Sequence, residues 1–243
     1  RAASQFMNRL FPGKLRAAAL LVANQRTREA LPRGTTGRIV LLPENGVDLQ
    51  TWFPGELPIA AAPVRFVFSG RLVDWKAVDL LLEAFAKLTT GATLDIIGDG
   101  PQRALLEAQV QGLGLAGRVR FHGWLPQPQA ALILRNSDVL VLPSLYECGG
   151  AVVLEAMATG LPVIATAWGG PADYIDAGCG ILVQPDSRDG FINGLAAAMQ
   201  LLGADPALRE RMGRAGRIKA ANEYDWNAKV DKMLQIYSEA VAG

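Results

Sequence analysis

The sequence predicts an α/β protein built on an open parallel sheet with helices on both faces. From Val64 onward, short apolar segments rich in branched residues alternate with longer amphipathic segments. Continuous apolar strands are typical of sheets buried on both faces, and their alternation with helices favours parallel pairing. Glycine-rich or charged segments follow several of these strands, at the edge where such sheets bind ligands.

The strands and helices of this region can be placed by the lengths of the apolar runs and by the helical spacing between them. We expect strands at Val64–Ser69, Thr93–Ile97, Val119–His122, Val139–Leu142, Val163–Ala165 and Gly180–Val183. We expect helices near Ala77–Leu88, Gln102–Gly112, Pro128–Arg135, Gly150–Thr159 and Arg188–Leu202.

The ends of the chain are organised differently. A helix and a short strand are expected before Ala23, further helical turns before Pro32, and a buried strand at Gly37–Leu42. The stretch Thr51–Pro63 contains three prolines and has no periodicity, which indicates a linker. After a polar helix at Asp205–Ala221, an amphipathic helix at Ala228–Val241 needs a partner for its apolar face.

Length and composition bound the function. The chain has 243 residues, half of them hydrophobic, and a formal net charge of +1. This size allows one large or two small domains, and the charge gives no indication of a nucleic-acid partner. Two cysteines without metal-ligand spacing favour a reducing compartment. No apolar run is long enough to cross a bilayer, and a first residue of Arg rather than Met leads us to expect a piece of a longer protein.

The segment from Glu147 to Val163 carries the clearest chemical signal. Glu155 is its only internal charge and lies among valine, leucine, alanine and methionine residues. Burying a carboxylate without a partner costs several kcal/mol, so a polar group, such as the vicinal hydroxyls of a ribose, should face it. A carboxylate on the surface of a helix is the alternative.

A glycine pair opens the helix that carries Glu155. With Gly149 and Gly150 at its start, the first N–H groups of the helix point outward and can bind a phosphate. Glu147 precedes this end and either meets the group beyond the phosphates or is a solvated residue favoured by the helix dipole.

Two cations follow the first strand of the regular region. Arg71 and Lys76 flank a loop that leads into a helix, where they can converge on an anion, although basic loop residues are often simply solvated. The next strand ends in Gly98-Asp-Gly-Pro101, a turn that lacks the spacing of the dinucleotide fingerprint.

Three other residues at strand ends have two interpretations each. His122 is the only histidine and is more often a core or rim residue than a catalyst; without a second ligand at the right spacing, no metal site is expected. Trp124 either packs locally or lies against a nucleotide base. Trp168 precedes a glycine pair that either approaches a ligand or forms a tight turn.

Taken together, four loops resemble those of one enzyme family. The matching segments are Gly70-Arg71-Leu72 with Lys76 and Asp79, Gly98–Pro101, Val119–Gly123, and Pro143-Ser144 followed by Glu147-x7-Glu155-Ala-Met-Ala-Thr-Gly-Leu-Pro-Val-Ile. This set resembles the donor-binding half of the GT-B glycosyltransferases, in particular the retaining family 4, also called group 1. The resemblance covers about residues 20 to 241 and implies a Rossmann-like fold.

The resemblance also implies roles for individual residues. Arg71 and Lys76 would bind the diphosphate of a nucleotide sugar, and Glu147 would contact the donor sugar, so these three are the expected catalytic residues. The expected donor-binding residues are Gly70, Leu125, Gly149, Gly150, Ala151 and Glu155. Glu155 would hold the ribose, and backbone near Leu125 would touch the base. The family normally needs no metal and no cofactor besides the nucleotide sugar as co-substrate.

Two departures from the family pattern stand out. Gly149 occupies the position where an aromatic residue is usual, which leaves the shape of the sugar pocket open. The N-terminal acceptor domain is represented at most by a remnant, so we expect a remnant at residues 1–45, a linker at 46–63, the donor-binding domain at 64–225 and a crossing helix at 226–243.

The leading hypothesis is the donor-binding part of a bacterial-type retaining glycosyltransferase that uses UDP or GDP and does not complete the transfer by itself. A GT-B sugar-nucleotide epimerase and a stand-alone nucleotide-binding module are the alternatives. The expected partners are a nucleotide sugar and a sugar or lipid-linked acceptor. A cytoplasmic location is expected, with peripheral contact to the inner membrane and dimerisation through an exposed surface as further hypotheses. The basic residues considered for membrane contact, which could instead lie on a solvated helix face, are Arg9, Lys14, Arg16, Arg26 and Arg28.

Overall fold

The computed structural model describes residues 13, 17–55, 63–89 and 91–242. The chain divides into two compact units. The larger unit comprises Val47–Glu223, and the smaller comprises Arg1–Gly46 together with Tyr224–Gly243.

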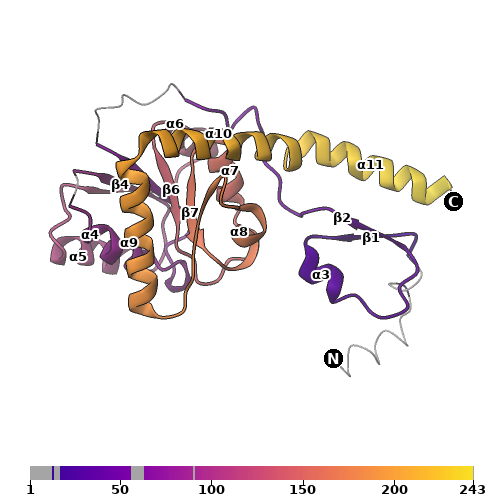
Figure 1. The fold of residues 1–243 in the computed structure, drawn as a ribbon, viewed down its shortest axis with the longest axis horizontal. Coiled ribbons are helices and arrows are strands. Elements are labelled where there is room, and N and C mark those ends of the chain that lie inside the picture. The colour runs from indigo at the N-terminus through magenta and orange to yellow at the C-terminus, as the bar shows by residue number, and fades with distance from the viewer. Residues whose placement is uncertain (1–12, 14–16, 56–62, 90, 243) are drawn as a thin grey trace. The chain divides into compact units, whose positions relative to one another are not determined.

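The larger unit contains a six-stranded parallel sheet in its described residues, with the order β5-β4-β3-β6-β7-β8 (Figure 1). The strands are β3 (Arg65–Ser69), β4 (Thr93–Ile97), β5 (Val119–Gly123), β6 (Val139–Leu142), β7 (Val163–Thr166) and β8 (Gly180–Val183). Every residue of β6 and of β7 is buried. These central strands therefore read as unbroken apolar runs because both faces of the sheet are covered.

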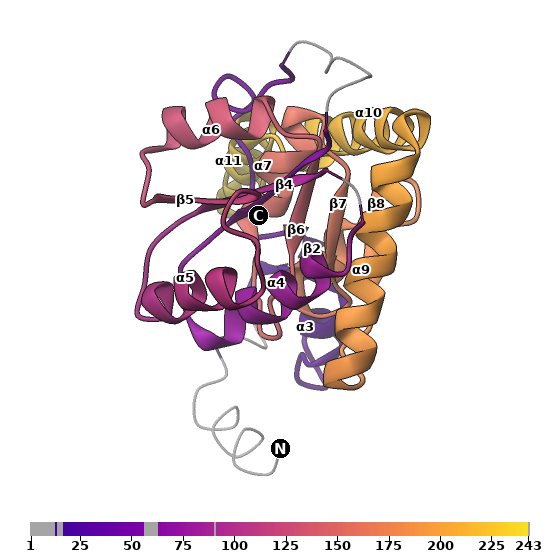
Figure 2. The ribbon, with the colours of Figure 1, turned by 90° about the vertical axis from the view of Figure 1, so that its left-hand side faces the viewer.

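Helices cover the two faces of this sheet (Figure 2). On one side α4 packs against both α5 and α9, and on the other α7 packs against both α6 and α10. The helices are α4 (Val78–Ala86), α5 (Arg103–Gly112), α6 (Gln127–Arg135), α7 (Ala151–Thr159), α8 (Gly169–Tyr174), α9 (Arg188–Ala204) and α10 (Pro206–Glu223), with a 3-10 turn η1 (Asp74–Lys76) before α4.

Aromatic side chains fix α4 against the sheet. Phe66 of β3 and Phe85 of α4 are both fully buried, and their rings meet edge to face with centroids 6.2 Å apart. This geometry places the positive edge of one ring on the negative face of the other. The start of α4, where the loop after β3 ends, is thereby held in a fixed position.

The segment before β3 also belongs to the larger unit. Trp52 is only 4% exposed, and its carbonyl oxygen accepts a hydrogen bond of 3.1 Å from Nη1 of Arg217. The guanidinium of Arg135 lies 3.8 Å from the ring centroid of Phe53. Within the stretch predicted as a linker, residues 47–55 are thus packed, whereas residues 56–62 lie outside the described residues.

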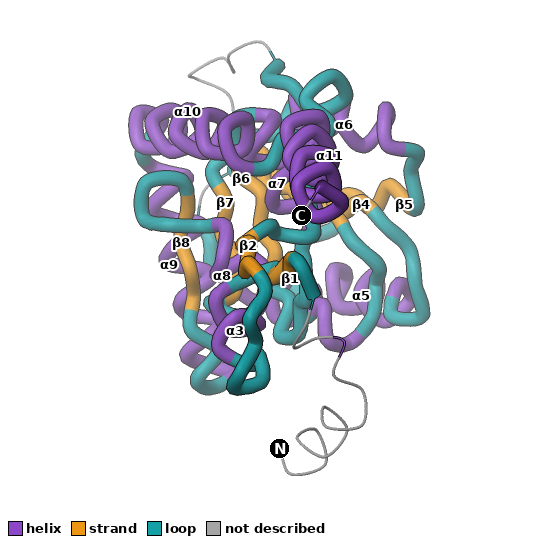
Figure 3. Tube along the Cα trace, turned by 90° about the vertical axis from the view of Figure 1, so that its right-hand side faces the viewer, coloured by secondary structure: helices purple, strands orange, loops and turns teal. Residues whose placement is uncertain are grey.

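The smaller unit has a two-stranded parallel sheet of β1 (Ala19–Val22) and β2 (Arg38–Leu41), connected through α3 (Gln25–Glu29) (Figure 3). The described part of this unit also contains the long α11 (Trp226–Ala242). The ammonium group of Lys229 on α11 donates hydrogen bonds to the carbonyl oxygens of Pro43 and Asn45. Burial lowers the pKa of Lys229 to about 8.

One face of α11 is apolar and exposed. Its large exposed side chains recur at helical spacing and are Trp226, Val230, Leu234, Tyr237 and Val241. The prediction of an amphipathic closing helix is therefore confirmed. None of the described helices is both long and apolar enough to serve as a membrane span.

The predicted fold class is confirmed, and all six predicted strands of the larger unit agree with the structure to within one residue at each end. The structure adds α8 where the sequence suggested a turn or a close backbone approach at Trp168–Pro171. The basic residues Arg9, Lys14 and Arg16, considered for membrane contact, lie outside the described residues.

Candidate functional site

The order of the strands locates the site. The chain passes from β3 outward through β4 to β5, and later from β6 outward through β7 to β8, while β3 and β6 lie side by side. In open α/β sheets, a crevice forms beyond the carboxyl ends of the strands at such a reversal, and ligands bind there. The loops that follow β3 and β6 therefore define the candidate site.

The loop after β3 is supported from behind by the turn after β4. A Cβ atom at Gly98 would lie 1.9 Å from the carbonyl oxygen of Gly70, and one at Gly100 would lie 2.3 Å from that of Leu72. Both glycines also have positive φ angles. Only glycine therefore allows this approach, which fixes the backbone at Gly70 and Leu72.

The same loop ends in a short turn that directs Lys76. The turn η1 spans Asp74–Lys76, and Ala77 then adopts a left-handed conformation with a φ of 51°. This conformation costs a non-glycine residue about 1 kcal/mol or more, and packing must compensate. The backbone N–H of Leu145, in the loop after β6, donates to the carbonyl oxygen of Trp75 at 2.8 Å and ties the two loops together.

An ion pair joins the two loops across the crevice. The ammonium group of Lys76 donates to Oε2 of Glu147, and the two side chains are only 16% and 13% exposed. The second oxygen of Glu147, Oε1, accepts a hydrogen bond of 3.2 Å from the backbone N–H of Gly150. Such a half-buried pair is screened little by solvent, so removing one partner leaves an unfavourable charge.

A second glycine pair holds the loop after β6 in place. Gly169 has a φ of +66°, and a Cβ there would lie 1.8 Å from the carbonyl oxygen of Glu147. The N–H of Gly170 donates to that same oxygen at 3.2 Å. Of the two interpretations of this pair, a tight turn or a backbone approach, the structure shows a close approach to the protein's own Glu147 loop.

The start of α7 offers unused backbone donors. Among the described residues, no acceptor is bonded to the N–H groups of Gly149, Ala151 and Val152, whereas that of Gly150 is already bonded to Glu147. Gly150 itself adopts φ +67° at the N-cap. These donors and the positive end of the helix dipole suit an anion.

Arg71 adds a cation to this region. Its side chain is exposed, and no hydrogen bond or ion pair to it is formed within the described residues. Counting Arg71, Lys76 and the helix end as positive and Glu147 as negative, the local charge is about +1.5. A diphosphate would neutralise all of it.

Glu155 lies on α7, four residues after its first residue, Ala151. At the helical rise, this places it about 6 Å along the axis from the free amides. Burial raises the pKa of Glu155 to about 7. Its carboxylate has no hydrogen-bond or ion-pair partner in the described structure, so the polar group expected to face it does not come from these residues.

The loop after β5 leads into α6, and α6 packs against α7. Leu125 is half-buried in this loop, and Trp124 is 75% exposed. The interpretation of Trp124 as a packed residue is therefore wrong. His122 lies at the rim, as expected, with its Nε2 atom 2.6 Å from Oδ1 of Asp95.

Two aromatic residues beside Glu147 were not identified from the sequence as a pair. The rings of Tyr146 and Trp168 lie with centroids 4.8 Å apart and planes inclined by 38°. Tyr146 directly precedes Glu147 and Trp168 directly precedes Gly169. The only sequence signal was an aromatic residue in each loop, and only the fold brings the two loops together.

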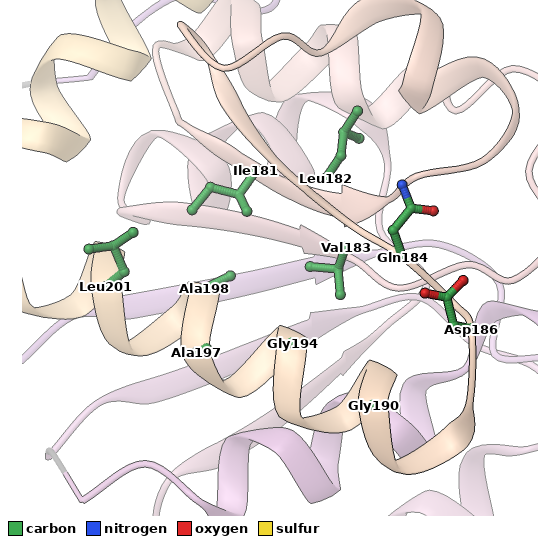
Figure 4. A pocket seen from close by; sticks show the side chains of 10 residues that line it. All are labelled: Ile181, Leu182, Val183, Gln184, Asp186, Gly190, Gly194, Ala197, Ala198 and Leu201. Carbon is green, nitrogen blue, oxygen red and sulfur yellow. The ribbon is translucent and has the colours of Figure 1, made fainter.

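A hollow of about 480 Å³ lies elsewhere in the larger unit, between β8 and α9 (Figure 4). Asp186 is the only ionisable residue in its lining, which consists of Ile181, Leu182, Val183, Gln184, Asp186, Gly190, Gly194, Ala197, Ala198 and Leu201. It is formed by the edge strand and includes none of the residues predicted for the site. The chemistry therefore favours the crevice between β3 and β6.

The fold and this crevice define the C-terminal, Rossmann-like domain of a GT-B glycosyltransferase. Comparison with known proteins agrees: residues 53–219 match the family described as "Glycosyl transferases group 1". The chain belongs to this family, and the resemblance inferred from the sequence is confirmed.

Two of the proteins that this chain resembles are named as enzymes that make saccharides. Glycogen synthase from Mycobacterium tuberculosis is 33% identical over 204 residues, which cover 82% of this chain and 48% of that protein. The sucrose-phosphate synthase structure from Thermosynechococcus elongatus has a TM-score of 0.80 at 30% identity and covers 100% of this chain and 63% of its own.

A third solved structure is that of a single domain. The C-terminal domain of the group 1 glycosyl transferase LpcC from Francisella tularensis is 27% identical with a TM-score of 0.64, over 74% of this chain and 100% of that one. This chain spans about half the length of the curated relatives that it matches.

Proposed function

We propose that this chain is the donor-binding part of a retaining glycosyltransferase that moves a sugar from a nucleoside diphosphate sugar to an acceptor. The observation that carries this proposal is the Lys76–Glu147 ion pair between the loops after β3 and β6, beside the free amides of α7. The family of the chain and the names of its relatives support the reaction class.

The diphosphate binds between the two loops. Lys76 has three donors, so it keeps Glu147 with one and offers two to a phosphate. Arg71 adds a planar fork, and the N–H groups of Gly149 and Ala151 meet the remaining oxygens. At Gly70, the absence of a side chain leaves the backbone open to the ligand.

The nucleoside extends along α7. The ribose hydroxyls donate to Glu155, whose carboxylate has no partner and lies about 6 Å along the helix from the amides. Binding two hydroxyl donors favours the ionised form and offsets the cost of burying it. The base then lies at the loop after β5, near the backbone of Leu125.

In the reaction, the bond between the anomeric carbon and the diphosphate oxygen breaks, and its electron pair leaves with the diphosphate. Arg71, Lys76 and the α7 amides stabilise this charge, while Glu147 holds the donor sugar. The acceptor oxygen forms the new bond on the same face of the carbon and releases its proton to the departing oxygen. With a local charge of about +1.5, we expect this to proceed without a metal, and transfer should survive dialysis against EDTA.

The ribose assignment is tested by calorimetric titration with uridine, guanosine and adenosine diphosphates and with pyrophosphate. Glu155→Ala should weaken binding of the preferred nucleotide about tenfold or more and change pyrophosphate affinity little, because pyrophosphate lacks the hydroxyls. Glu107→Ala, a change on the exposed face of α5, is the control and should alter neither. Equal losses for nucleotide and pyrophosphate would contradict the assignment, and failure of every nucleotide to bind would overturn the proposed function.

Acceptor binding, dimerisation, cytoplasmic location and peripheral membrane contact stay predictions. Arg26 and Arg28, both exposed on α3, are the described residues considered for membrane contact. Binding to vesicles of anionic lipid that weakens with added salt would support that contact, because exposed charges are screened within about 8 Å at physiological salt.

A further inference from the structure

Large aromatic side chains remain exposed around the Lys76–Glu147 pair. Tyr146 is 57% exposed, Trp168 is 37% exposed, and Trp75, which neighbours Lys76, is 48% exposed. Exposing several large apolar rings within one small region is unfavourable and commonly marks a binding surface. In this crevice, the binding surface adjoins the residues proposed to hold the donor sugar.

The pair of Tyr146 and Trp168 is held by the backbone and does not need a ligand to form. The N–H of Trp168 donates to the carbonyl oxygen of Thr166 at 2.7 Å, and the N–H of the preceding Ala167 donates to that of Val183 at 2.8 Å. Gly169 and Gly170 then press against the backbone of the Glu147 loop. Rings that are positioned in advance lose little freedom on binding and so favour affinity.

The chemistry of this surface suits a saccharide. A pyranose ring presents axial C–H groups on its face and hydroxyls at its rim, so it stacks on a flat ring while its rim bonds to polar neighbours. Tyr146 and Trp168 supply flat rings with a phenol and an indole N–H. An alkyl chain would favour an apolar groove without these polar groups.

We propose that Tyr146 and Trp168 form a stacking surface for a sugar ring of the acceptor. This inference rests on the proposed function, which assigns the donor sugar to Glu147. Tyr146 directly precedes Glu147, so a sugar stacked on its ring lies near the residue assigned to the donor sugar. The two aromatic residues thus select a saccharide acceptor and position it, without touching the nucleotide.

The test uses two-dimensional NMR of the tryptophan indole N–H groups of the 243-residue chain. The probes are maltotriose, cellotriose and chitotriose, added with the preferred nucleoside diphosphate present. The resonance lost in Trp168→Phe identifies Trp168. We expect at least one saccharide to shift this resonance on titration, while that of the buried Trp52 stays unchanged.

Variants separate stacking from simple apolar packing. Trp168→Leu and Tyr146→Leu should each weaken saccharide binding about tenfold, whereas Trp168→Phe and Tyr146→Phe should retain most of the affinity. Tyr237→Leu, an equally exposed tyrosine on α11, is the matched control and should have no effect. Nucleotide affinity should stay unchanged in every variant.

Three outcomes would overturn the inference. The first is that no saccharide shifts Trp168 although the nucleotide binds, which would leave the proposed function intact. The second is that the leucine and phenylalanine variants behave alike. The third is that both rings become inaccessible to solvent in the full-length protein, which would make the surface a protein interface.

Discussion

At the scale of single residues, Glu147 is the group on which the site converges. Its two oxygens accept from Lys76 and from the N–H of Gly150, so one carboxylate joins the loop after β3 to the start of α7. Glu155 differs because it has no partner, and burial raises its pKa to about 7. One acid is therefore organised by the protein, and the other is left for a ligand.

Removing the cation should affect catalysis strongly. In the complete protein, Lys76→Ala should lower the rate of sugar transfer about a hundredfold or more, because one preorganised donor to the leaving group is lost. Steady-state kinetics with the preferred donor measures this. Lys219→Ala is a matched control, since Lys219 is also paired with a carboxylate, at 2.6 Å from Oδ2 of Asp176, and is 21% exposed. Similar rates for the two variants would exclude Lys76 from the reaction.

The stability of the protein should depend on the protonation of Glu155. Its pKa is 4.5 when unperturbed and about 7 when folded, so the folded state favours the protonated form. Stability from this group is fully present below pH 4.5 and is lost as the pH rises through 7. Relative to wild type, Glu155→Gln should gain about 3 kcal/mol between these limits.

Urea unfolding of both proteins at pH 4.5, the unperturbed pKa, and at a pH above the folded pKa of about 7 measures this difference. A constant difference between wild type and Glu155→Gln across this range would show that burial does not perturb the carboxyl group.

At the scale of elements, the site is formed by glycine-dependent contacts between loops. The turn after β4 supports the loop after β3, and the start of α8 supports the loop after β6. The local sequence predicted the strands and most helices because their apolar periodicity is strong. It did not predict α8, whose six residues begin with two glycines and a proline.

The contact at the start of α8 can be tested at Gly169. Gly169→Ala places a Cβ 1.8 Å from the carbonyl oxygen of Glu147 at a φ of +66°. We expect a loss of about 2 kcal/mol or more in unfolding free energy and weaker nucleotide binding, because the Glu147 loop must move. Thermal unfolding and calorimetry measure the two effects.

Gly117→Ala is the control for this change, since a Cβ there meets nothing within 4 Å and the backbone needs no positive φ. It should leave both stability and binding close to wild type. If Gly169→Ala behaves in the same way, the contact with Glu147 does not position the loop.

At the scale of the whole molecule, the chain divides into two units, and the residues proposed for donor binding all belong to one of them. Every residue proposed to hold the donor lies in Val47–Glu223, which has its own sheet and core. The smaller unit contributes the exposed apolar face of α11. In the relative from Francisella tularensis, a C-terminal domain alone forms the solved chain.

We therefore expect residues 47–223 alone to unfold in one cooperative transition and to bind the preferred nucleoside diphosphate as tightly as the 243-residue chain. Circular dichroism during heating and calorimetric titration test this. Deleting residues 47–55 as well should destabilise the domain, because Trp52 is buried in it. A broad transition without nucleotide binding would show that the larger unit depends on the smaller one.

The sequence by itself determined the strand and helix pattern, the family, and the residue types in the loops, because these depend on local periodicity and short motifs. Only the tertiary structure decided that Lys76 pairs with Glu147, 71 positions away, that Glu155 has no partner, and that Tyr146 meets Trp168. Such contacts depend on which strands become neighbours, and this is settled by burial of the whole sheet and not by any one segment.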